Sequence, residues 1–318
     1  MSGYGMCGHV MVNFQDSYGT SQTTSLQAVP VVNESLVLGI EQIVEQNMYG
    51  RLGESPYHEG AHGITGGVSL EAEPTAMGWF MKSVIGTVAT TSDTGIQSHV
   101  FIPSLCGSEF DTRAATTPLT MEVYRDVGSA GVYYDCVGNQ LSISIANGQL
   151  LSMDVDFIGA GFSRKAAATP SFPTGKPFTW DQASVEISSQ SVVDLEELTV
   201  TVNNNLEATH TLTNTKAPYR IKRTGPQQVE LSGSMIFAAE SYFQAFENQT
   251  EVPFKAHFVN NAAPHTFTMD FPKIRFKTFE PQQADAGLIK ASFTAQAIFD
   301  TGSNRACEFT LVNTQTYY

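Results

Sequence analysis

The chain has 318 residues, which is enough for two domains of ordinary size. Hydrophobic residues make up 42% of it and charged residues 15%, a composition typical of folded globular proteins rather than of disordered chains. The net charge of −14 comes from 31 acidic and 17 basic side chains, so the surface repels phosphates and tight binding of nucleic acid is not expected.

No long apolar run predicts a membrane helix, and the start of the chain has neither the basic residues nor the apolar stretch of a signal peptide. The four cysteines are isolated from one another, so neither a disulfide framework nor a zinc site is predicted. We therefore expect a protein that is made and kept in the cytoplasm and has no membrane partner.

The first half of the chain is predicted to begin with a flexible arm over residues 1–24, followed by alternating apolar residues in Glu34 to Tyr49. A strand behind the glycines of His62 to Ala72 comes next, and a helix is predicted from Pro74 to Ile85. The stretch from Thr87 to Thr117 is rich in Thr, Ser and Gly, which predicts a long extended loop. Three more strands are predicted over 119–124, 132–145 and 148–158.

The last of these strands shows the clearest two-residue period. Leu151, Met153 and Val155 fall on one face, whereas Asp154 and Asp156 fall on the other. This alternation predicts a strand that covers a core with one face and meets water with the opposite face.

The second half repeats the order of the first. Three prolines between Ser163 and Phe178 predict a solvent-exposed connector, which we extend to a linker over 163–183. Strand-like sequence resumes at Leu195 to Thr211, and a helix is predicted at Ala239 to Phe246. Strands follow over 252–259, 266–279 and 287–299, and Pro218-Tyr219 stands where Pro56-Tyr57 stands in the first half.

The shared order predicts an internal duplication, with units at residues 25–162 and 184–318. The fold class expected is mainly β: two tandem sandwich or barrel units, each with one short helix.

One motif suggests chemistry. His58, Glu59 and His62 fit the HExxH pattern of zinc hydrolases, which needs both histidines on one helical face. Glycines and a proline crowd these residues and predict a loop, and no third ligand follows at a suitable spacing. We expect no enzyme activity and no cofactor, and keep a metallohydrolase as the alternative.

Several long runs resemble the major tail tube proteins of long-tailed, siphovirus-like bacteriophages. They include ESLVLGIEQIVEQNMY, GITGGVSLEAEPTAMGWFMKSVIG, YRIKRTGPQQVELSGSMIF and GLIKASFTAQAIFD, and the similarity extends from about residue 25 to residue 314. The resemblance implies two packed antiparallel sheets with a flanking helix, in rings that stack into a tube around the path of the DNA. It also implies a location in the virion tail after assembly in the host cytoplasm. The partners implied are the chain itself and the tail terminator, tape measure and distal tail proteins.

Tube rings of this family are sixfold, so a chain with two units predicts a trimer with pseudo-sixfold symmetry, with a hexamer as the alternative. If each unit lends four strands to the wall, the barrel has about 24 strands, wide enough for a water-filled channel. Asp154 and Asp156 are our candidates for an acidic lining that repels DNA while it passes. Another β-rich virion component, from a baseplate, a fibre or a decoration, remains a further alternative.

Overall fold

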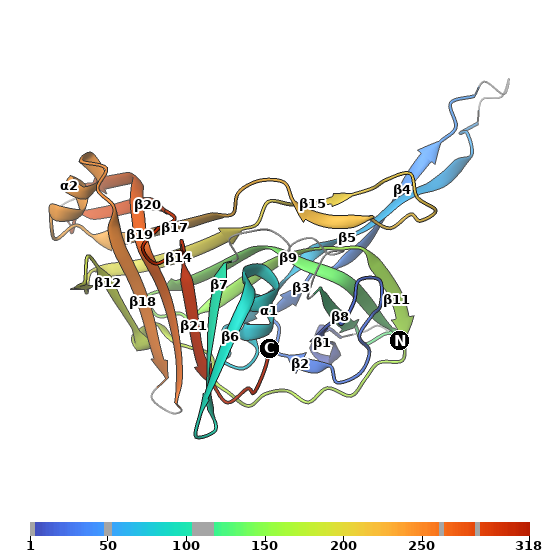
Figure 1. Ribbon diagram of the computed structural model, residues 1–318, viewed down its shortest axis with the longest axis horizontal. Helices are drawn as coiled ribbons and strands as arrows, with labels where there is room; N and C mark the ends of the chain where they lie inside the picture. Colours follow the sequence, from blue (N-terminus) through green and yellow to red (C-terminus); the bar gives the residue numbers. More distant parts are fainter. Residues whose placement is uncertain (1–3, 48–52, 104–117, 261–263, 284–286) are drawn as a thin grey trace.

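The computed structural model describes residues 4–47, 53–103, 118–260, 264–283 and 287–318. The protein is mainly β, as predicted, and its two α-helices are α1 (Met77–Ile85) and α2 (Ser241–Glu247) (Figure 1). The strands of the first half are β1 (His9–Phe14), β2 (Gln27–Val29), β3 (Asn33–Glu34), β4 (Val37–Val44), β5 (Tyr57–Glu71), β6 (Gly86–Asp93), β7 (Ile96–Pro103), β8 (Leu119–Tyr124), β9 (Ala130–Ala146), β10 (Ser152–Gly159) and β11 (Gly161–Lys165). The strands of the second half are β12 (Ala183–Ile187), β13 (Gln190–Val192), β14 (Leu195–Asn203), β15 (Leu206–Thr209), β16 (Arg220–Arg223), β17 (Gln228–Ile236), β18 (Val252–Asn260), β19 (His265–Gln282), β20 (Lys290–Ala297) and β21 (Glu308–Asn313).

One antiparallel sheet, here called the long sheet, runs through both halves of the chain. Its strand order is β4-β5-β10-β9-β14-β17-β20-β19. The first four strands come from the first half and the last four from the second, and the pair β9–β14 joins them. The order is therefore the same in each half. Two neighbouring strands (β4 and β5, or β14 and β17) are followed by a strand from late in that half, here called the late strand (β10 or β20), and then by the longest strand of the half (β9 or β19).

Apolar side chains cross the long sheet in rows that face the core, because the two-residue period of each strand is aligned with that of its neighbours. In the row Leu70-Met153-Ile143-Val200-Leu231-Ala295-Phe276, every residue is buried. The alternation predicted for 148–158 is therefore confirmed, and the same pattern holds in every strand that this row crosses.

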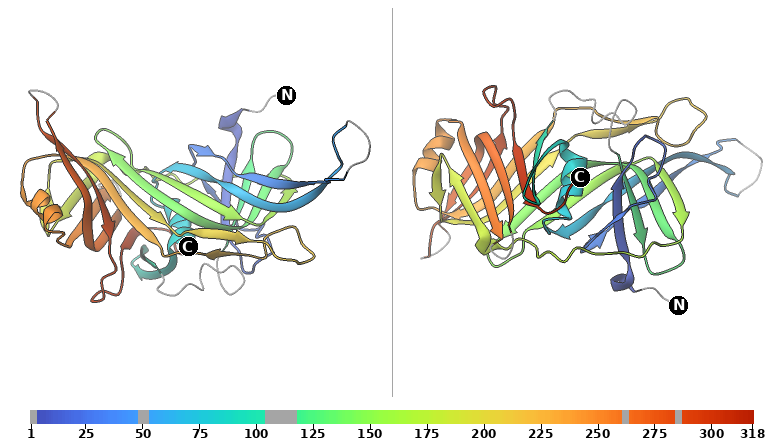
Figure 2. Two further views of the ribbon diagram at one scale, coloured as in Figure 1. Left: turned by 90° about the horizontal axis from the view of Figure 1, so that it is seen from above. Right: turned by 60° about the horizontal axis from the view of Figure 1, so that its bottom comes forward.

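Two shorter sheets pack against the buried face of the long sheet, one in each half (Figures 1 and 2). The first has the order β2-β1-β8-β9-β11. The second has the matching order β13-β12-β18-β19-β21 and continues beyond β21 with β7 and β6 of the first half. Strands β9 and β19 are 17 and 18 residues long and belong to both layers of their half. The two halves thus have the same two-layer arrangement.

The two helices occupy matching places but differ in burial. Eight of the nine residues of α1 are buried, and the ring of Phe80 lies 6.0 Å from that of Phe157. No residue of α2 is fully buried, although Phe243 packs against Phe279 at 6.2 Å. The outer side of α2 is therefore open in the single chain.

The prediction of a flexible arm over residues 1–24 is wrong for most of this segment. Strand β1 lies between β2 and β8, and its Val10 and Val12 are buried. The loop that follows is tied down by the Asp135 carboxylate, which accepts hydrogen bonds from Gln15 Nε2 (2.9 Å) and Gly19 N (2.8 Å). The apolar residues of the short run HVMVNF favour a strand, but the glycine-rich sequence before them led to the prediction of a flexible arm.

The connector predicted over 163–183 is ordered at both ends. Residues 163–165 complete strand β11, which pairs with β9. Phe178 is fully buried, with its ring 6.1 Å from that of Phe258, and a turn of 3-10 helix, Trp180–Gln182, leads into β12. Most of the residues between Lys165 and Phe178 are exposed, as the prolines indicated.

The predicted loop from Thr87 to Thr117 is also corrected in part. Residues 87–103 form the hairpin β6–β7, and β7 pairs with the C-terminal strand β21. Strand β6 contains three threonines and one valine, and these β-branched residues favour a pleated strand even though serine and glycine, which are common in loops, surround them. The rest of this segment, 104–117, lies outside the described residues.

His99 sits fully buried where this hairpin meets the C-terminus. Its ring nitrogens bond Thr90 Oγ1 at 2.8 Å and Gln315 O at 2.9 Å, and burial lowers its pKa below 6.5. Below about pH 6.5, His99 is protonated in the unfolded chain but remains neutral in the folded chain. The unfolded state therefore binds more protons, and the free energy of unfolding should fall as the pH drops. Urea unfolding at several pH values should show a shallower pH dependence for His99→Gln, and an unchanged slope would contradict this role.

Candidate functional site: the polar face and open edges of the long sheet

The face of the long sheet that points away from the core carries rows of polar side chains. One row is Ser69-Asp154-Ser142-Thr201-Glu230-Gln296-Arg275. The next is Glu71-Ser152-Ser144-Thr199-Ser232-Thr294-Thr278. Serine and threonine predominate, so this polar face is a broad surface of short, mostly uncharged side chains.

Many groups on the polar face are already bonded to each other. Ser144 Oγ lies 2.7 Å from Ser152 Oγ, and Thr278 Oγ1 lies 2.8 Å from Thr294 Oγ1. Lys277 Nζ lies 3.4 Å from Glu230 Oε1, so this cation is paired with a carboxylate. These hydroxyls and this cation therefore have hydrogen-bond or ion-pair partners within the chain itself.

The predicted residues Asp154 and Asp156 lie on this polar face, and both are exposed. Each faces a small residue of β5, because Asp154 stands opposite Ser69 and Asp156 opposite Gly67. A Cβ atom at Gly67 would come within 2.7 Å of Asp156 Oδ1, so glycine leaves room for the carboxylate. Within the described part of the chain neither aspartate forms a salt bridge.

The HExxH residues lie in strand β5 and not in the loop that we predicted. A strand points His58 and Glu59 to opposite faces, so the helical geometry of a zinc hydrolase is absent. His58 Nε2 lies 2.8 Å from Glu45 Oε1. Glu59 forms an ion pair with Lys216, whose hydrogen bond and charge lower the pKa of that carboxyl. Among the residues that the structure describes, no group of three His, Cys, Asp or Glu side chains could hold a metal.

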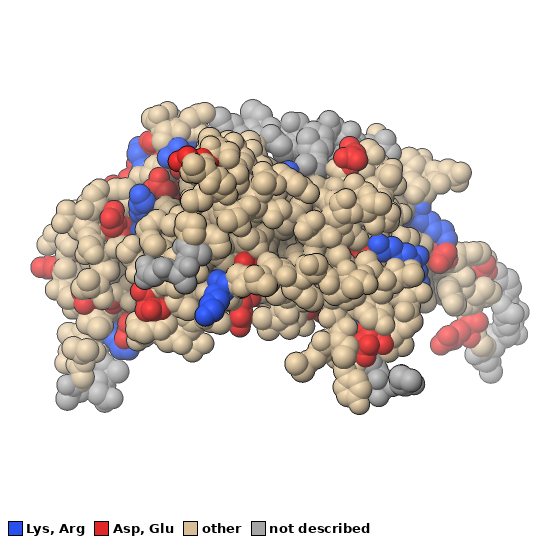
Figure 3. Space-filling model, turned by 90° about the horizontal axis from the view of Figure 1, so that it is seen from below, with Lys and Arg blue, Asp and Glu red and all other residues tan. Residues whose placement is uncertain are grey.

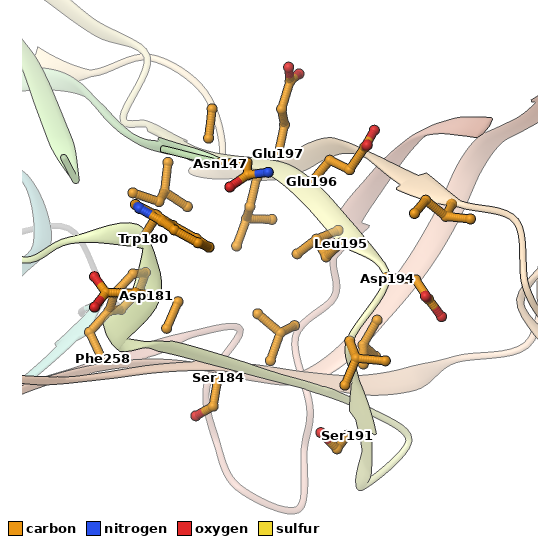
Figure 4. Close-up of a pocket in the computed structure, with 18 residues that line it drawn as sticks. Asn147, Trp180, Asp181, Ser184, Ser191, Asp194, Leu195, Glu196, Glu197 and Phe258 are labelled. Atoms are coloured by element: carbon orange, nitrogen blue, oxygen red, sulfur yellow. The ribbon is translucent and has the colours of Figure 1, made fainter. Parts of the chain in front are cut away.

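A hollow of about 570 Å³ opens between the start of β14 and the β12–β13 hairpin (Figure 4). Trp180, Leu195 and Phe258 line it, with carboxylates such as Asp181 and Glu196 at its rim. Glu196 is paired with Lys290 at 2.7 Å. The residues that line the hollow include no histidine, cysteine or lysine, so its serines have no histidine or lysine beside them to act as the base.

The long sheet ends in two open edges that the sequence did not reveal. In the described residues β4 pairs only with β5, and the part of β19 beyond Ile274 pairs only with β20. The β4–β5 hairpin projects beyond the body of the molecule (Figures 1 and 2). It exposes apolar side chains, namely Val37, Ile40, Ile43, Val44 and Tyr57. An apolar edge of this kind invites pairing with another strand.

Charged side chains of both signs lie interspersed on the face shown in Figure 3, and no extended basic patch appears there. None of the helices in the described ranges has the length and apolar character needed to cross a bilayer. The model of the family described as phage tail tube protein matches residues 8–297. The chain belongs to this family. A search of curated proteins found no match.

Membership makes this tail tube protein a structural subunit of the phage tail and a component of the virion. The predicted family and the predicted mainly β fold are both confirmed. The metallohydrolase alternative is not favoured, since its three residues lie in a strand that ends in a projecting hairpin.

Proposed function

We propose that copies of the tail tube protein close into a ring through the two open edges of the long sheet, and that the rings stack into a tube. The observation that carries this proposal is the continuity of the long sheet across both halves of one chain, with an unpaired strand at each end. A contact between two different edges is head-to-tail, and a ring results when the rotation per copy closes. Closure also removes the exposed edges.

The ring holds three copies. The junction β9–β14 already joins two matching halves within a chain, so each copy contributes two pseudo-equivalent units of four strands. Three copies give six units and a barrel of about 24 strands, in which duplex DNA fits. The order of the two short sheets supports a duplication, with the first unit starting at β1 rather than after a free arm. A hexamer of whole chains would double this number of strands.

The polar face lines the tube in this arrangement, because the other face of the long sheet is covered by the short sheets and α1. Unpaired carboxylates repel the DNA backbone, whereas unpaired lysines would hold it through release of counterions. Serine and threonine rows between them present no fixed charge. The protein thus forms a conduit through which DNA passes into the host without sticking.

Asp154→Lys combined with Asp156→Lys should slow the release of DNA from particles while tubes still assemble. The change places up to six lysines in a trimeric ring, on a face where Lys277 is paired with Glu230 and Arg275 with Glu251. The rate of release, followed by dye binding to the emerging DNA, should drop about tenfold at low salt and recover as salt rises. Asp16→Lys with Asp93→Lys, at exposed carboxylates off the polar face, is the matched control. Equal release rates for both double variants would argue against a lining role for Asp154 and Asp156.

We propose a structural rather than an enzymatic role, with the chain itself as the main partner and the tail terminator, tape measure and distal tail proteins at the ends or inside of the tube. Native mass spectrometry of rings released from tubes tests the stoichiometry. The expected mass is three times that of the 34.5 kDa chain. A mass of six chains would favour the hexamer, and a protein that never leaves the monomer would contradict the tube.

A further inference from the structure

We propose that β4 of one copy pairs with the C-terminal part of β19 of the next copy in one defined antiparallel register, in which Val37 faces Glu280. The inference rests on the proposed ring and adds the contact that closes it. It follows from using the junction inside the chain, β9–β14, as the template for the junction between copies.

The first step matches β19 to β9. Each of these strands has one bulge in its pairing with the neighbouring late strand. The residue that is skipped is Asn139 in β9 and Lys277 in β19. Bulges are fixed features of a strand, so these two residues correspond. Counting onward, Ser142 corresponds to Glu280.

The second step matches β4 to β14 across the sheet. Val37 pairs with Thr65, and Thr65 pairs with Ile158. In the other half, Thr201 pairs with Glu230, and Glu230 pairs with Gln296. Ile158 and Gln296 correspond, since each lies just beyond the bulge of its own half. Val37 therefore corresponds to Thr201.

The third step transfers the known pair. Inside the chain, Ser142 of β9 faces Thr201 of β14. Their counterparts are Glu280 and Val37, so these two residues face each other where β19 of one copy meets β4 of the next. Both counterparts are exposed in the single chain, and both lie on the side of the polar face.

A feature of the edges independently supports this register. Ser35 donates its N–H to Gly67 O of β5 at 2.9 Å, so the backbone groups of Leu36 point to the open edge. In the proposed register Leu36 faces Pro281, which has no N–H to donate. The carbonyl of Leu36 does not need that donor, because Arg125 Nη2 already bonds it at 2.8 Å. The position that lacks a donor thus faces an edge carbonyl that a side chain already satisfies.

The hairpin beyond β4 also fits the neighbour. Inside the chain, the corresponding hairpin β15–β16 covers the first half through an apolar cluster of Val137, Leu206 and Ile221. Their counterparts at the outer junction are Arg275, Gln42 and Tyr57, all exposed. The Tyr57 ring can receive the Arg275 guanidinium of the next copy, a favourable pairing of ring and cation.

Disulfide cross-linking tests the register. The chain carries Val37→Cys and Glu280→Cys in a background with Cys7→Ser and Cys106→Ser, and rings are oxidised before denaturing electrophoresis. The pair is of the type without hydrogen bonds, with Cα atoms about 4.5 Å apart, which allows a disulfide. Closed trimers should form when oxidised and vanish on reduction. Ser142→Cys with Thr201→Cys is the matched control and should cross-link within one chain.

Gly39→Cys with Glu280→Cys is the shifted variant, and it should give little cross-linked product. If rings form and the shifted pair cross-links in place of Val37 and Glu280, the register is wrong while the proposed function stands. The same conclusion follows if rings form and only the internal control reacts. If even the unmodified protein forms no rings, the proposed function itself fails.

Discussion

The variant Ile40→Pro should remain folded as a monomer and fail to form rings. Ile40 corresponds to Asn204, whose N–H donates to Asn139 O at 2.8 Å, so the N–H of Ile40 is expected to reach the carbonyl of Lys277 in the next copy. Proline removes this donor and places its ring against the facing strand, yet an edge strand tolerates it when the N–H faces solvent. Each junction should lose about 2 kcal/mol or more, which raises the concentration needed for assembly at least tenfold. Analytical ultracentrifugation measures this directly.

Ile40→Thr is the matched control for this prediction. Threonine keeps the N–H and the branched shape of the side chain, and it should assemble nearly as the natural protein does. A proline variant that still forms rings at the usual concentration would show that the edge of β4 does not carry the contact. A proline variant that unfolds would show instead that β4 holds the chain itself together, and the circular dichroism spectrum separates these two outcomes.

The variant Phe80→Ala should cause the largest loss of stability in the single chain. Phe80 is fully buried on α1 between the long sheet and the second layer, next to Phe157. Removing such a ring leaves a cavity as well as losing apolar contact, and the free energy of unfolding should fall by about 3–5 kcal/mol. Urea unfolding of the monomer, followed by tryptophan fluorescence, gives this value from the shift of the midpoint.

Phe243→Ala is the matched control, since Phe243 lies on the other helix, α2, and packs against Phe279 but is only half buried. Its cost in the monomer should be about 1–2 kcal/mol, because less apolar surface leaves water there. A loss as large as that of Phe80→Ala would contradict the contrast between the two helices.

The strands with strict alternation could be predicted from sequence, and the two helices were found within a few residues of their true starts. The predicted helix at Pro74 begins at Met77, and the one at Ala239 begins at Ser241. Strand β1 was missed because six residues between polar and glycine-rich segments carry little periodic signal. The hairpin β6–β7 was missed because its pairing partner, β21, lies more than two hundred residues away.

The candidate site was predicted only in part. Alternation placed Asp154 and Asp156 on the exposed face, because an acidic residue between buried ones in a strand has only one side to occupy. The open edges could not be predicted in the same way, since backbone groups leave no trace in the residue pattern. The Pro-Tyr pairs matched Tyr57 of the first half to Tyr219 of the second. The strand pairing instead matches Tyr57 to Ile221, so the prediction from sequence was in error by two residues. Bulges, which set the true register, are visible only in the pairing.

The most direct test of the account is an averaged electron micrograph of rings or tubes, viewed along the axis without imposed symmetry. We predict three identical copies that show six similar lobes around one continuous wall, with β4 of each copy beside β19 of the next. Six identical copies with twelve lobes, or three copies whose long sheets do not meet at these edges, would contradict it.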